Sequence, residues 1–237
     1  MQSFEILRSS KPMDWVATVV ASTQVSPTIK SIRLQLPSTE FQFLPGQSLW
    51  PKFERDGKTF TKIYSIASSP SRCPVVDLCV SRVGWSSMFL QDLEPGQTIP
   101  VRGPYGMMTL AELPDRPRLY IAEGSGIAPI KSHIDWLAEQ RFGRPVWLVQ
   151  ANPETPDCLP YQDAWRSLSQ TWATFHYVEV TDTRPEAILP DLPLNLDTMA
   201  VDVDICAVGD RVSQLYDSVL ALGIPPHRIR TEKFVAF

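Results

Sequence analysis

The chain has 237 residues, of which 43% are hydrophobic and 20% are charged, and this length suffices for one large domain or for two of about 110 to 120 residues. A net charge of −4 and the lack of a basic run exclude nucleic acid as the expected partner. The chain has no apolar stretch of about 18 residues, and its Met1–Pro12 segment lacks a signal-peptide core, so we expect a cytoplasmic protein with no membrane span.

The first half of the chain has the pattern of short strands separated by turns. Alternating or β-branched residues occur in six segments, divided by Pro, Gly and Ser clusters. The segments are Trp15–Val20, Ile29–Leu36, Gln47–Phe53, Phe60–Ile66, Val75–Arg82 and Thr98–Arg102. A helical pattern, Ser86–Asp92, falls between the fifth and sixth segments. This spacing predicts an N-terminal six-stranded antiparallel β-barrel.

From residue 119 onward strands and helices alternate. The expected strands are Leu119–Ala122, Val146–Gln150, Phe175–Val180, Asp204–Val208 and Ile229–Phe234, and the expected helices are Ile130–Gln140, Gln162–Ser169 and Val212–Leu222. Such alternation predicts a Rossmann-like α/β domain with a parallel sheet, whose ligand sits at the carboxyl ends of the strands. We place the domains at residues 1–113 and 114–237, and we expect the proline-containing stretch Arg184–Asp197 to be a loop.

A glycine turn lies between the first strand of this second half and its first helix. Gly124, Ser125 and Gly126 follow the apolar run, and Pro129 falls in the first helical turn, where a missing N–H is no loss. Glycines let backbone N–H groups approach an anion, and the helix start adds unpaired donors. The sequence therefore indicates a phosphate site, with a purely structural turn as the alternative.

The four cysteines lie far apart in the sequence and form no C-x-x-C pair. They are Cys73, Cys79, Cys158 and Cys206. Their spacing predicts neither a disulfide framework nor a zinc, iron–sulfur or other metal site. Any redox centre is therefore expected to be a bound organic cofactor.

Six short motifs occur along the chain in a fixed order. They are Pro-Gly-Gln at 45–47, Lys-x-Tyr-Ser-x-Ala-Ser at 62–68, Gly-x-x-Ser-x-x-Leu-x-x-Leu at 84–93, Gly-Pro-x-Gly at 103–106, Gly-x-Gly-x-x-Pro at 124–129 and Glu-x-Phe at 232–234. In this order they resemble the motifs of the ferredoxin–NADP reductase superfamily, over about residues 14–237. The resemblance implies an FAD-binding barrel (the FR type) followed by an NAD-binding α/β domain, with no fused iron–sulfur domain.

The resemblance implies a flavin site in the barrel. Its residues are Lys62, Tyr64, Ser65, Ile66, Gly84, Ser86, Ser87 and Met88. A tyrosine at a strand end offers an aromatic wall to the flavin ring, and hydroxyls and amides at a helix start suit its phosphate. A half-buried strand tyrosine and a plain helix cap are the alternatives. Lysine stands at 62 where the family usually has arginine, which leaves FMN as the alternative to the expected FAD.

The resemblance also implies a nicotinamide-nucleotide site in the second half. Gly124, Ser125, Gly126 and Pro129 would bind the pyrophosphate, and Ser65, Cys206, Glu232 and Phe234 would form the hydride-transfer neighbourhood. The Phe234 ring would shield the flavin, with Phe237 as the alternative ring. A cysteine alone at the end of an apolar strand is more often typical of core packing. After the third strand, Thr181 and Asp182 favour NADH, because a carboxylate prefers ribose hydroxyls to a phosphate, whereas Arg184 leaves NADPH open.

These features together predict a flavin-dependent NAD(P)H oxidoreductase that passes electrons to a separate acceptor. The acceptor is expected to be a ferredoxin-like redox protein, a quinone or a small molecule. Three departures from the family, at Lys62, Glu123 and Ala207, leave an alternative. Glu123 places a carboxylate beside the expected pyrophosphate unless it pairs with a cation, and Ala207 replaces a strand-end glycine. The alternatives are a flavin-binding regulatory protein without turnover and a scaffold used for protein interaction.

Overall fold

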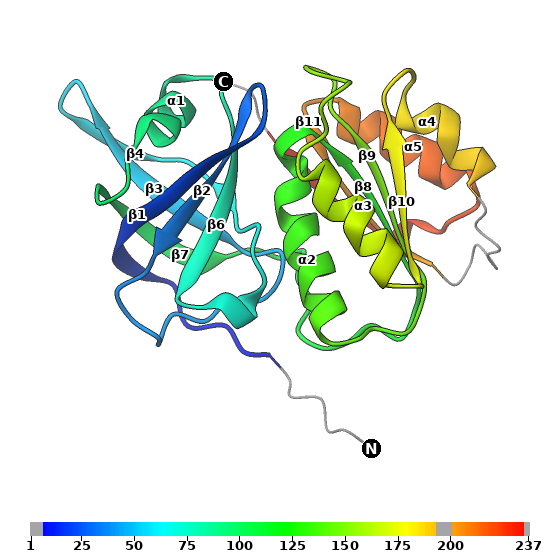
Figure 1. Cartoon of the computed structure of the whole chain (residues 1–237), viewed down its shortest axis with the longest axis horizontal. Coiled ribbons are helices and arrows are strands. Elements are labelled where there is room, and N and C mark those ends of the chain that lie inside the picture. The colour runs from blue at the N-terminus through cyan, green and yellow to red at the C-terminus, as the bar shows by residue number, and fades with distance from the viewer. Residues whose placement is uncertain (1–6, 193–200, 235–237) are drawn as a thin grey trace.

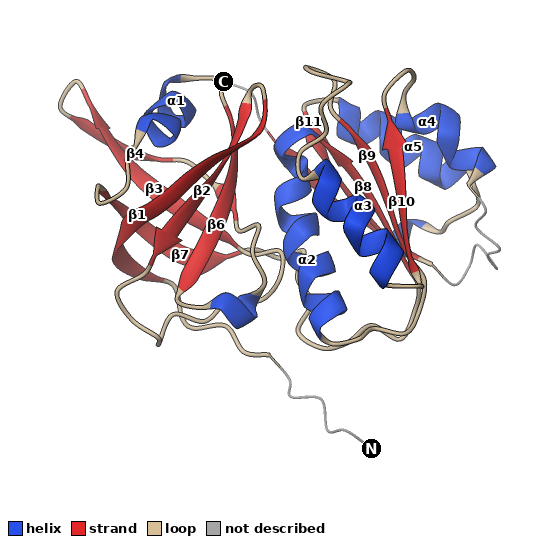
Figure 2. Cartoon of the chain, in the orientation of Figure 1, coloured by secondary structure: helices blue, strands red, loops and turns tan. Residues whose placement is uncertain are grey.

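The computed structural model describes residues 7–192 and 201–234. Figure 1 shows two bodies side by side, an antiparallel barrel formed by the first half of the chain and a helix-covered parallel sheet formed by the second. Figure 2 shows that the barrel carries little helix, whereas helices cover the parallel sheet. In the described parts of the chain, no helix is both long enough and apolar enough to cross a bilayer.

The barrel consists of antiparallel strands whose alternate side chains fill its interior. The strands are β1 (Met13–Ser26), β2 (Ile29–Gln35), β3 (Ser48–Arg55), β4 (Lys58–Thr61), β5 (Tyr64–Ser65), β6 (Val75–Ser81) and β7 (Thr98–Tyr105). They run in the order β4-β3-β7-β1-β2-β6, and β5 pairs with β3. The barrel closes where Ile66 bridges to Leu78 and the Ala67 N–H donates to the Asp77 carbonyl at 2.7 Å. An antiparallel barrel is therefore present as predicted.

The fourth predicted strand, Phe60–Ile66, is two strands in the structure. Strand β4 ends at Thr61 and β5 begins at Tyr64, so the sheet has seven strands rather than six. The chain leaves the sheet at Lys62 and Ile63, and the Ile63 side chain is 60% exposed. The apolar pattern is continuous across this break, and for that reason the sequence did not reveal it.

Helix α1 (Trp85–Asp92) covers one end of the barrel between β6 and β7, as the sequence predicts (Figure 1). Leu90 and Gln91 face inward, and the Gln91 side-chain amide donates to the carbonyls of Thr28 and Val80 at 3.0 and 2.6 Å. These bonds fix the helix against β6 and the β1–β2 turn. The start of α1 therefore has a defined position at the edge of the barrel.

The second half forms a five-stranded parallel sheet of the Rossmann kind. Its strands are β8 (Arg118–Glu123), β9 (Val146–Ala151), β10 (Phe175–Val180), β11 (Asp202–Val208) and β12 (Ile229–Phe234), and its helices are α2 (Ile127–Glu139), α3 (Gln162–Thr171), α4 (Pro185–Ile188) and α5 (Arg211–Ala221). The strand order is β10-β9-β8-β11-β12, with all strands parallel. The chain adds β9 and β10 on one side of β8 and then β11 and β12 on the other, so the order reverses between β8 and β11. In such sheets ligands bind in the crevice at that reversal, outside the carboxyl ends of the strands.

Helices cover the parallel sheet on both faces. Figure 1 shows α2 and α3 on the side of the barrel, and α4 and α5 on the far side. Helix α2 is buried along most of its length because it packs against both the sheet and the barrel. Apolar barrel residues, among them Ile29, Ala67 and Leu110, belong to one hydrophobic cluster with α2. The two bodies therefore share part of their core.

Two segments of the second half differ most from the prediction, whereas the other helices and strands differ by at most two residues at either end. Helix α2 begins at Ile127, three residues earlier than expected, because the 3₁₀ turn Gly124–Gly126 leads directly into it. The predicted loop Arg184–Asp197 contains α4 and the 3₁₀ turn Leu189–Asp191, because a proline occupies the first position of α4 and the second position of the turn. Residues 193–197 of that stretch lie outside the described residues.

Candidate functional site

A cleft of about 690 Å³ lies between the barrel and the carboxyl ends of the parallel strands. A volume of this size is within the range of small-molecule and cofactor sites. The predicted site residues that line it are Lys62, Tyr64, Ser65, Gly84, Ser86, Ser87, Gly124, Ser125, Glu232 and Phe234. The structure therefore brings the predicted flavin motif, helix start, glycine turn and C-terminal motif to one cavity.

Ser65 and Glu232 meet across the cleft. The Ser65 hydroxyl, at the end of β5, donates to Glu232 Oε1 on β12 at 2.8 Å, although 167 positions separate the two in sequence. Burial raises the pKa of Glu232, the hydrogen bond from Ser65 opposes the shift, and the charge of Asp204 adds to it. This contact places a hydroxyl and a carboxyl with a raised pKa at one point between the two bodies.

Cys206 lies beneath this contact and is fully buried on β11. Its strand partner in register is Glu232. Burial holds the pKa of the Cys206 thiol well above its ordinary value, so the thiol stays protonated. A Cβ atom added to Gly126 would lie 2.4 Å from the Cys206 carbonyl oxygen, so only glycine fits at 126. The glycine turn therefore packs directly on the strand that carries Cys206.

The glycine turn itself forms the start of α2. Gly124 has a φ of +56°, which favours glycine, and Gly124–Gly126 forms the 3₁₀ turn that precedes the helix. The first N–H groups of a helix have no partner within it and carry the positive end of its dipole. Pro129 lies inside the first turn and is buried. The turn therefore presents backbone donors to an anion from the cleft.

Glu123 precedes the turn and is 3% exposed, and a cation pairs with it. Arg211, the first residue of α5, donates from Nη2 to Glu123 Oε1 at 2.6 Å and from Nε to Oε2 at 3.1 Å. The same guanidinium donates from Nη1 to Glu186 Oε1 at 2.5 Å. The carboxylate beside the glycine turn is thus paired with a cation, which it shares with Glu186. The departure from the family pattern at 123 is compensated within the chain.

On the barrel side, Tyr64 lies half-buried against the start of α1. Burial raises the pKa of its phenol, and a hydrogen bond with Ser86 opposes that shift. Ser87 is engaged differently: its hydroxyl accepts from the N–H groups of Val83 and Gly84, each at 3.0 Å, and donates to the Gly84 carbonyl at 2.8 Å. Ser87 therefore caps its own helix. The Ser86 hydroxyl and the backbone N–H groups are the polar groups that α1 offers to the cleft.

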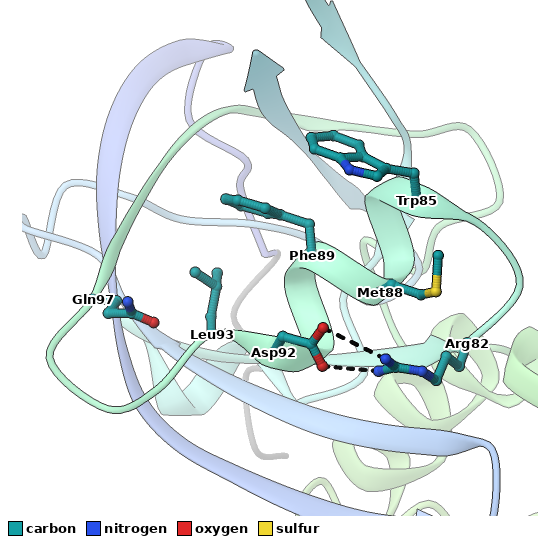
Figure 3. A pocket seen from close by; sticks show the side chains of 7 residues that line it. All are labelled: Arg82, Trp85, Met88, Phe89, Asp92, Leu93 and Gln97. Atoms are coloured by element: carbon teal, nitrogen blue, oxygen red, sulfur yellow. Dashed lines mark hydrogen bonds and ion pairs between the residues drawn. The ribbon is translucent and has the colours of Figure 1, made fainter. Parts of the chain in front are cut away.

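Met88 belongs to a second, smaller cavity of about 390 Å³ on the other side of α1. Figure 3 shows the Trp85 and Phe89 rings side by side above it, and the Arg82–Asp92 ion pair, at 2.9 Å, along its edge. The Met88 N–H donates to the Gly84 carbonyl at 2.9 Å. Met88, although predicted to bind cofactor, therefore lies apart from the main cleft.

Five other predicted residues do not line the cleft: Ile66, Gly126, Pro129, Thr181 and Asp182. Ile66 is buried and closes the barrel, Gly126 packs on the Cys206 carbonyl, and Pro129 is buried in the first turn of α2. Thr181 and Asp182 follow β10, the edge strand farthest from β12, and Asp182 is exposed. Phe237, the alternative ring, lies outside the described residues.

The sequence analysis missed several residues that line the cleft. They are Thr61, Ile63, Cys79, Ser81, Val83, Asn152, Pro153, Glu154, Val208, Arg211 and Lys233. Asn152, Val208 and Arg211 follow the carboxyl ends of β9 and β11, so the strand-end rule would have found them. Asn152 donates from Nδ2 to Thr155 Oγ1 at 2.7 Å and to the Cys158 carbonyl at 2.8 Å, and these bonds fix the loop after β9.

Comparison with known proteins gives two family matches in chain order. Residues 16–110 match an oxidoreductase FAD-binding domain, and residues 120–188 match an oxidoreductase NAD-binding domain. The chain is similar to ferredoxin–NADP reductase B of Sorangium cellulosum, with 27% identity over 92% of this chain and 96% of that protein. It is similar to the phenol hydroxylase P5 protein of Acinetobacter pittii, with 31% identity over 73% of this chain and 49% of that protein.

Solved structures show the same fold at low sequence identity. The FAD/NAD-binding domain of a nitric oxide dioxygenase from Vibrio cholerae superposes with a TM-score of 0.81 at 18% identity and covers 93% of this chain and 98% of that one. A ferredoxin NADP+ reductase from Neisseria gonorrhoeae with bound FAD and NADP superposes with a TM-score of 0.76 at 18% identity and covers 95% and 99%. With its FAD-binding barrel and its NAD-binding α/β domain, the chain belongs to the ferredoxin–NADP reductase superfamily.

Proposed function

We propose that this protein is a flavin-dependent NAD(P)H oxidoreductase that passes electrons to a separate acceptor. The hydrogen bond between Ser65 and Glu232 carries the proposal, because it joins the flavin motif of the barrel to the terminal motif of the sheet at 2.8 Å. Bound FAD supplies the chemistry, since a flavin accepts a hydride and releases electrons singly or in pairs. The chain supplies binding, orientation and a proton route.

We assign binding roles by position in the cleft. Tyr64 provides an aromatic wall, and the start of α1 with the Ser86 hydroxyl and Lys62 faces the flavin phosphate. The turn Gly124–Gly126 binds the pyrophosphate of the nicotinamide nucleotide, and Phe234 covers the ring face that the nicotinamide occupies. These assignments fit a barrel domain of residues 1–113 and a nucleotide domain of residues 114–237.

Ser65 and Glu232 hold and move the proton of the reaction. The Glu232 carboxyl has a raised pKa because it is buried, so it exchanges a proton closer to neutral pH than an exposed carboxyl does. The Ser65 hydroxyl donates to Oε1 and is placed to relay that proton into the cleft. Cys206 stays a thiol and contributes packing beneath the pair.

The departures from the family pattern at Glu123 and Ala207 do not obstruct the cleft. Glu123 is paired with Arg211, and Ala207 packs in the cluster on the α5 face of the sheet, away from Cys206. Both observations favour the catalytic interpretation over a flavin-binding protein without turnover. NADH is the proposed coenzyme, because Asp182 follows β10 where a carboxylate suits ribose hydroxyls.

The acceptor is proposed from the names of the relatives. The chain is 32% identical over 76% of its length to a terephthalate 1,2-dioxygenase reductase component of Comamonas, and it spans about half of that relative and of the phenol hydroxylase P5 protein. We therefore propose that the electrons pass to a ferredoxin-like or oxygenase component in the cytoplasm. A quinone or a small molecule is the alternative acceptor.

The test is the anaerobic visible spectrum of the purified protein, supplemented with FAD if it is colourless. The proposal expects a yellow protein that one equivalent of NADH bleaches faster than one equivalent of NADPH. A yellow protein that neither nucleotide bleaches supports a regulatory flavoprotein instead. A protein that retains no flavin contradicts both interpretations.

A further inference from the structure

A buried ionic network lies behind the cleft, in the sheet that carries Cys206 and Glu232. Asp204 on β11 is fully buried and accepts hydrogen bonds from Arg118 on β8 and from Arg230 on β12, the latter at 2.6 Å (Nε) and 2.9 Å (Nη2). Burial opposes ionisation, but the two guanidinium groups hold the pKa of Asp204 well below its usual range. His133 on α2 places Nδ1 3.5 Å from the same carboxylate.

Two members of this network also contact residues 107–113, the linker that joins the two bodies. His133 Nε2 lies 3.0 Å from the Met108 carbonyl oxygen, and Arg230 Nη1 donates to the Thr109 carbonyl at 3.0 Å. Burial lowers the pKa of His133, so the ring is neutral, and the carbonyl fixes its single hydrogen on Nε2. Asp204 therefore holds Arg230, and Arg230 and His133 bind consecutive linker carbonyls. We call His133, Asp204 and Arg230 the linker clamp.

A turn of the barrel packs against the same Met108 carbonyl and the His133 ring. Gly46 has a φ of +89°, and a Cβ atom added there would lie 2.0 Å from the Met108 carbonyl oxygen and 2.5 Å from His133 Nε2. The Leu110 N–H donates to the Pro45 carbonyl at 3.3 Å. The barrel turn, the linker and α2 thus meet with no free space between them. A change in clamp geometry changes how the barrel sits on the sheet.

The linker clamp shares a strand face with Glu232, which together with Ser65 we call the reactive pair. Asp204 pairs with Arg230 in register, and Cys206 pairs with Glu232 two positions further along β11 and β12. Residues two apart on a strand point to the same face, roughly 7 Å apart. The clamp and Glu232 therefore belong to one rigid pair of strands, and Ser65 stands opposite on the barrel.

We propose that His133, Asp204 and Arg230 are positioning residues that set the gap between Ser65 and Glu232 by fixing the linker. The proposal rests on the proposed function, because that gap matters only for transfer across the cleft. A misplacement of about 1 Å costs on the order of 100-fold in rate when reacting groups depend on orientation. The clamp residues act through Ser65 and Glu232 and touch no substrate.

The main test compares Arg230→Met with Arg166→Met in the flavin-loaded full chain. Arg166 forms a similar two-point pair with Glu179, at 2.6 and 2.7 Å, at the far edge of the same sheet, and it lines neither cavity. Arg118 still pairs with Asp204 when Arg230 is replaced, so the carboxylate keeps a cation. We expect Arg230→Met to lower the rate of flavin reduction at saturating NADH by about 10-fold or more. The flavin and nucleotide Kd values should change less than about 3-fold in both variants.

A second measurement separates positioning from charge compensation. Hydrogen exchange of the linker amides 107–113 should speed up by about 10-fold or more in Arg230→Met and stay unchanged in Arg166→Met. Arg230→Lys keeps the positive charge but not the fork that reaches both Asp204 and the Thr109 carbonyl, so it should restore stability without restoring the rate. His133→Phe, which loses the bond to Met108, should slow the rate in the same way.

Three outcomes overturn the inference. They are an unchanged reduction rate in Arg230→Met, unchanged exchange of the linker, and full rescue of the rate by Arg230→Lys. If Arg230→Met fails to fold, His133→Phe and Arg230→Lys decide the question with the same two measurements. If the wild-type protein is bleached by neither nucleotide, the proposed function fails. Linker exchange then still confirms or refutes the clamp.

Discussion

Helices α1 and α2 both begin next to a glycine at the edge of the cleft, but their starts are built in different ways. At α1 a side chain closes the helix start, since the Ser87 hydroxyl binds the N–H groups of Val83 and Gly84. At α2 the backbone alone forms the start, and Gly126 packs on the Cys206 carbonyl. We expect the first to tolerate changes that spare its cap, whereas the second has no room for a side chain at 126. Both helix starts present N–H groups to an anion, but we expect substitutions at the two starts to have different effects.

The largest effect is expected at α2. Gly126→Ala would place a Cβ atom 2.4 Å from the Cys206 carbonyl oxygen, which forces the turn away from β11. We expect a fall of about 100-fold or more in the NADH reduction rate and a loss of about 1 to 3 kcal/mol in the free energy of unfolding. Stopped-flow reduction and denaturant unfolding measure the two effects.

Gly143→Ala is the matched control for that variant. No atom lies within 4 Å of a Cβ added at Gly143, which is also outside the cleft. This control should keep the wild-type rate and stability. A Gly126→Ala protein with wild-type nucleotide reduction would contradict the close approach of the turn and β11.

The next effect concerns the ion pair beside α2. Arg211→Met leaves Glu123, only 3% exposed, without its cation, and removal of one partner of a buried pair costs about 3 to 5 kcal/mol. We expect a loss of about that size in the free energy of unfolding, measured with denaturant. The double variant Glu123→Gln with Arg211→Met should recover the part of the loss that comes from Glu123, whereas Glu186, which is more exposed, still lacks its cation. If the double variant is as unstable as the single one, the unpaired carboxylate is not the cause.

The third effect lies at the reactive pair itself. Glu232→Gln keeps the shape and the Ser65 contact but removes the titrating proton, so the reduction rate should fall by about 100-fold with flavin content unchanged. A rate that changes by less than about 3-fold would exclude Glu232 from the proton route. The pH profile of the remaining rate should also lose the ionisation that the wild type shows.

Glu232→Gln also predicts a change in stability of defined sign. The folded pKa of Glu232 is raised, so between the unfolded and folded values the native state holds a proton that the unfolded state has lost. Stability from this group is therefore lost as the pH rises through that window. The glutamine variant lacks this loss, so its Tm near neutral pH should equal or exceed the wild-type Tm. If the Tm of the glutamine variant instead falls below the wild-type Tm as the pH rises from acid to neutral, the raised pKa of Glu232 is contradicted.

The smallest effects separate the two serines of α1. Ser87→Ala removes the cap and should lower the free energy of unfolding by about 1 kcal/mol, which corresponds to about 2 to 4 °C in Tm. Ser86→Ala leaves the cap intact and should weaken flavin binding instead, measured by flavin fluorescence titration. The reverse assignment of the two phenotypes would show that Ser87 rather than Ser86 binds the flavin phosphate.

Local patterns predicted most of the elements because each carries its own period and its own turn residues. The parallel strands β9 and β10 lie within one residue of their predicted bounds, and α1 differs by one residue at its start. The prediction was wrong where a local pattern continued past a tertiary break, as at residues 60–66. There the alternation persisted while Lys62 and Ile63 left the sheet for the cleft.

The site was predictable in part, for a physical reason. Ser65 and Glu232 were found from their motifs, and the structure places them in contact. The linker clamp was not found, because His133, Asp204 and Arg230 come from three separate elements and meet only after folding. One signal was available: an aspartate inside the apolar strand Val203–Val208 needs a buried cation.

The hydrophobic cluster shared by the barrel and α2 makes the protein a single cooperative unit. Ile29 and Ala67 of the barrel pack in it with Ile130 and Ile134 of α2, whereas contacts between domains of one chain are usually more polar. Separation of the halves would expose this apolar surface to water on both. Recombination that exchanges one half for that of a relative must therefore preserve the cluster, so the two halves are constrained to evolve as a pair.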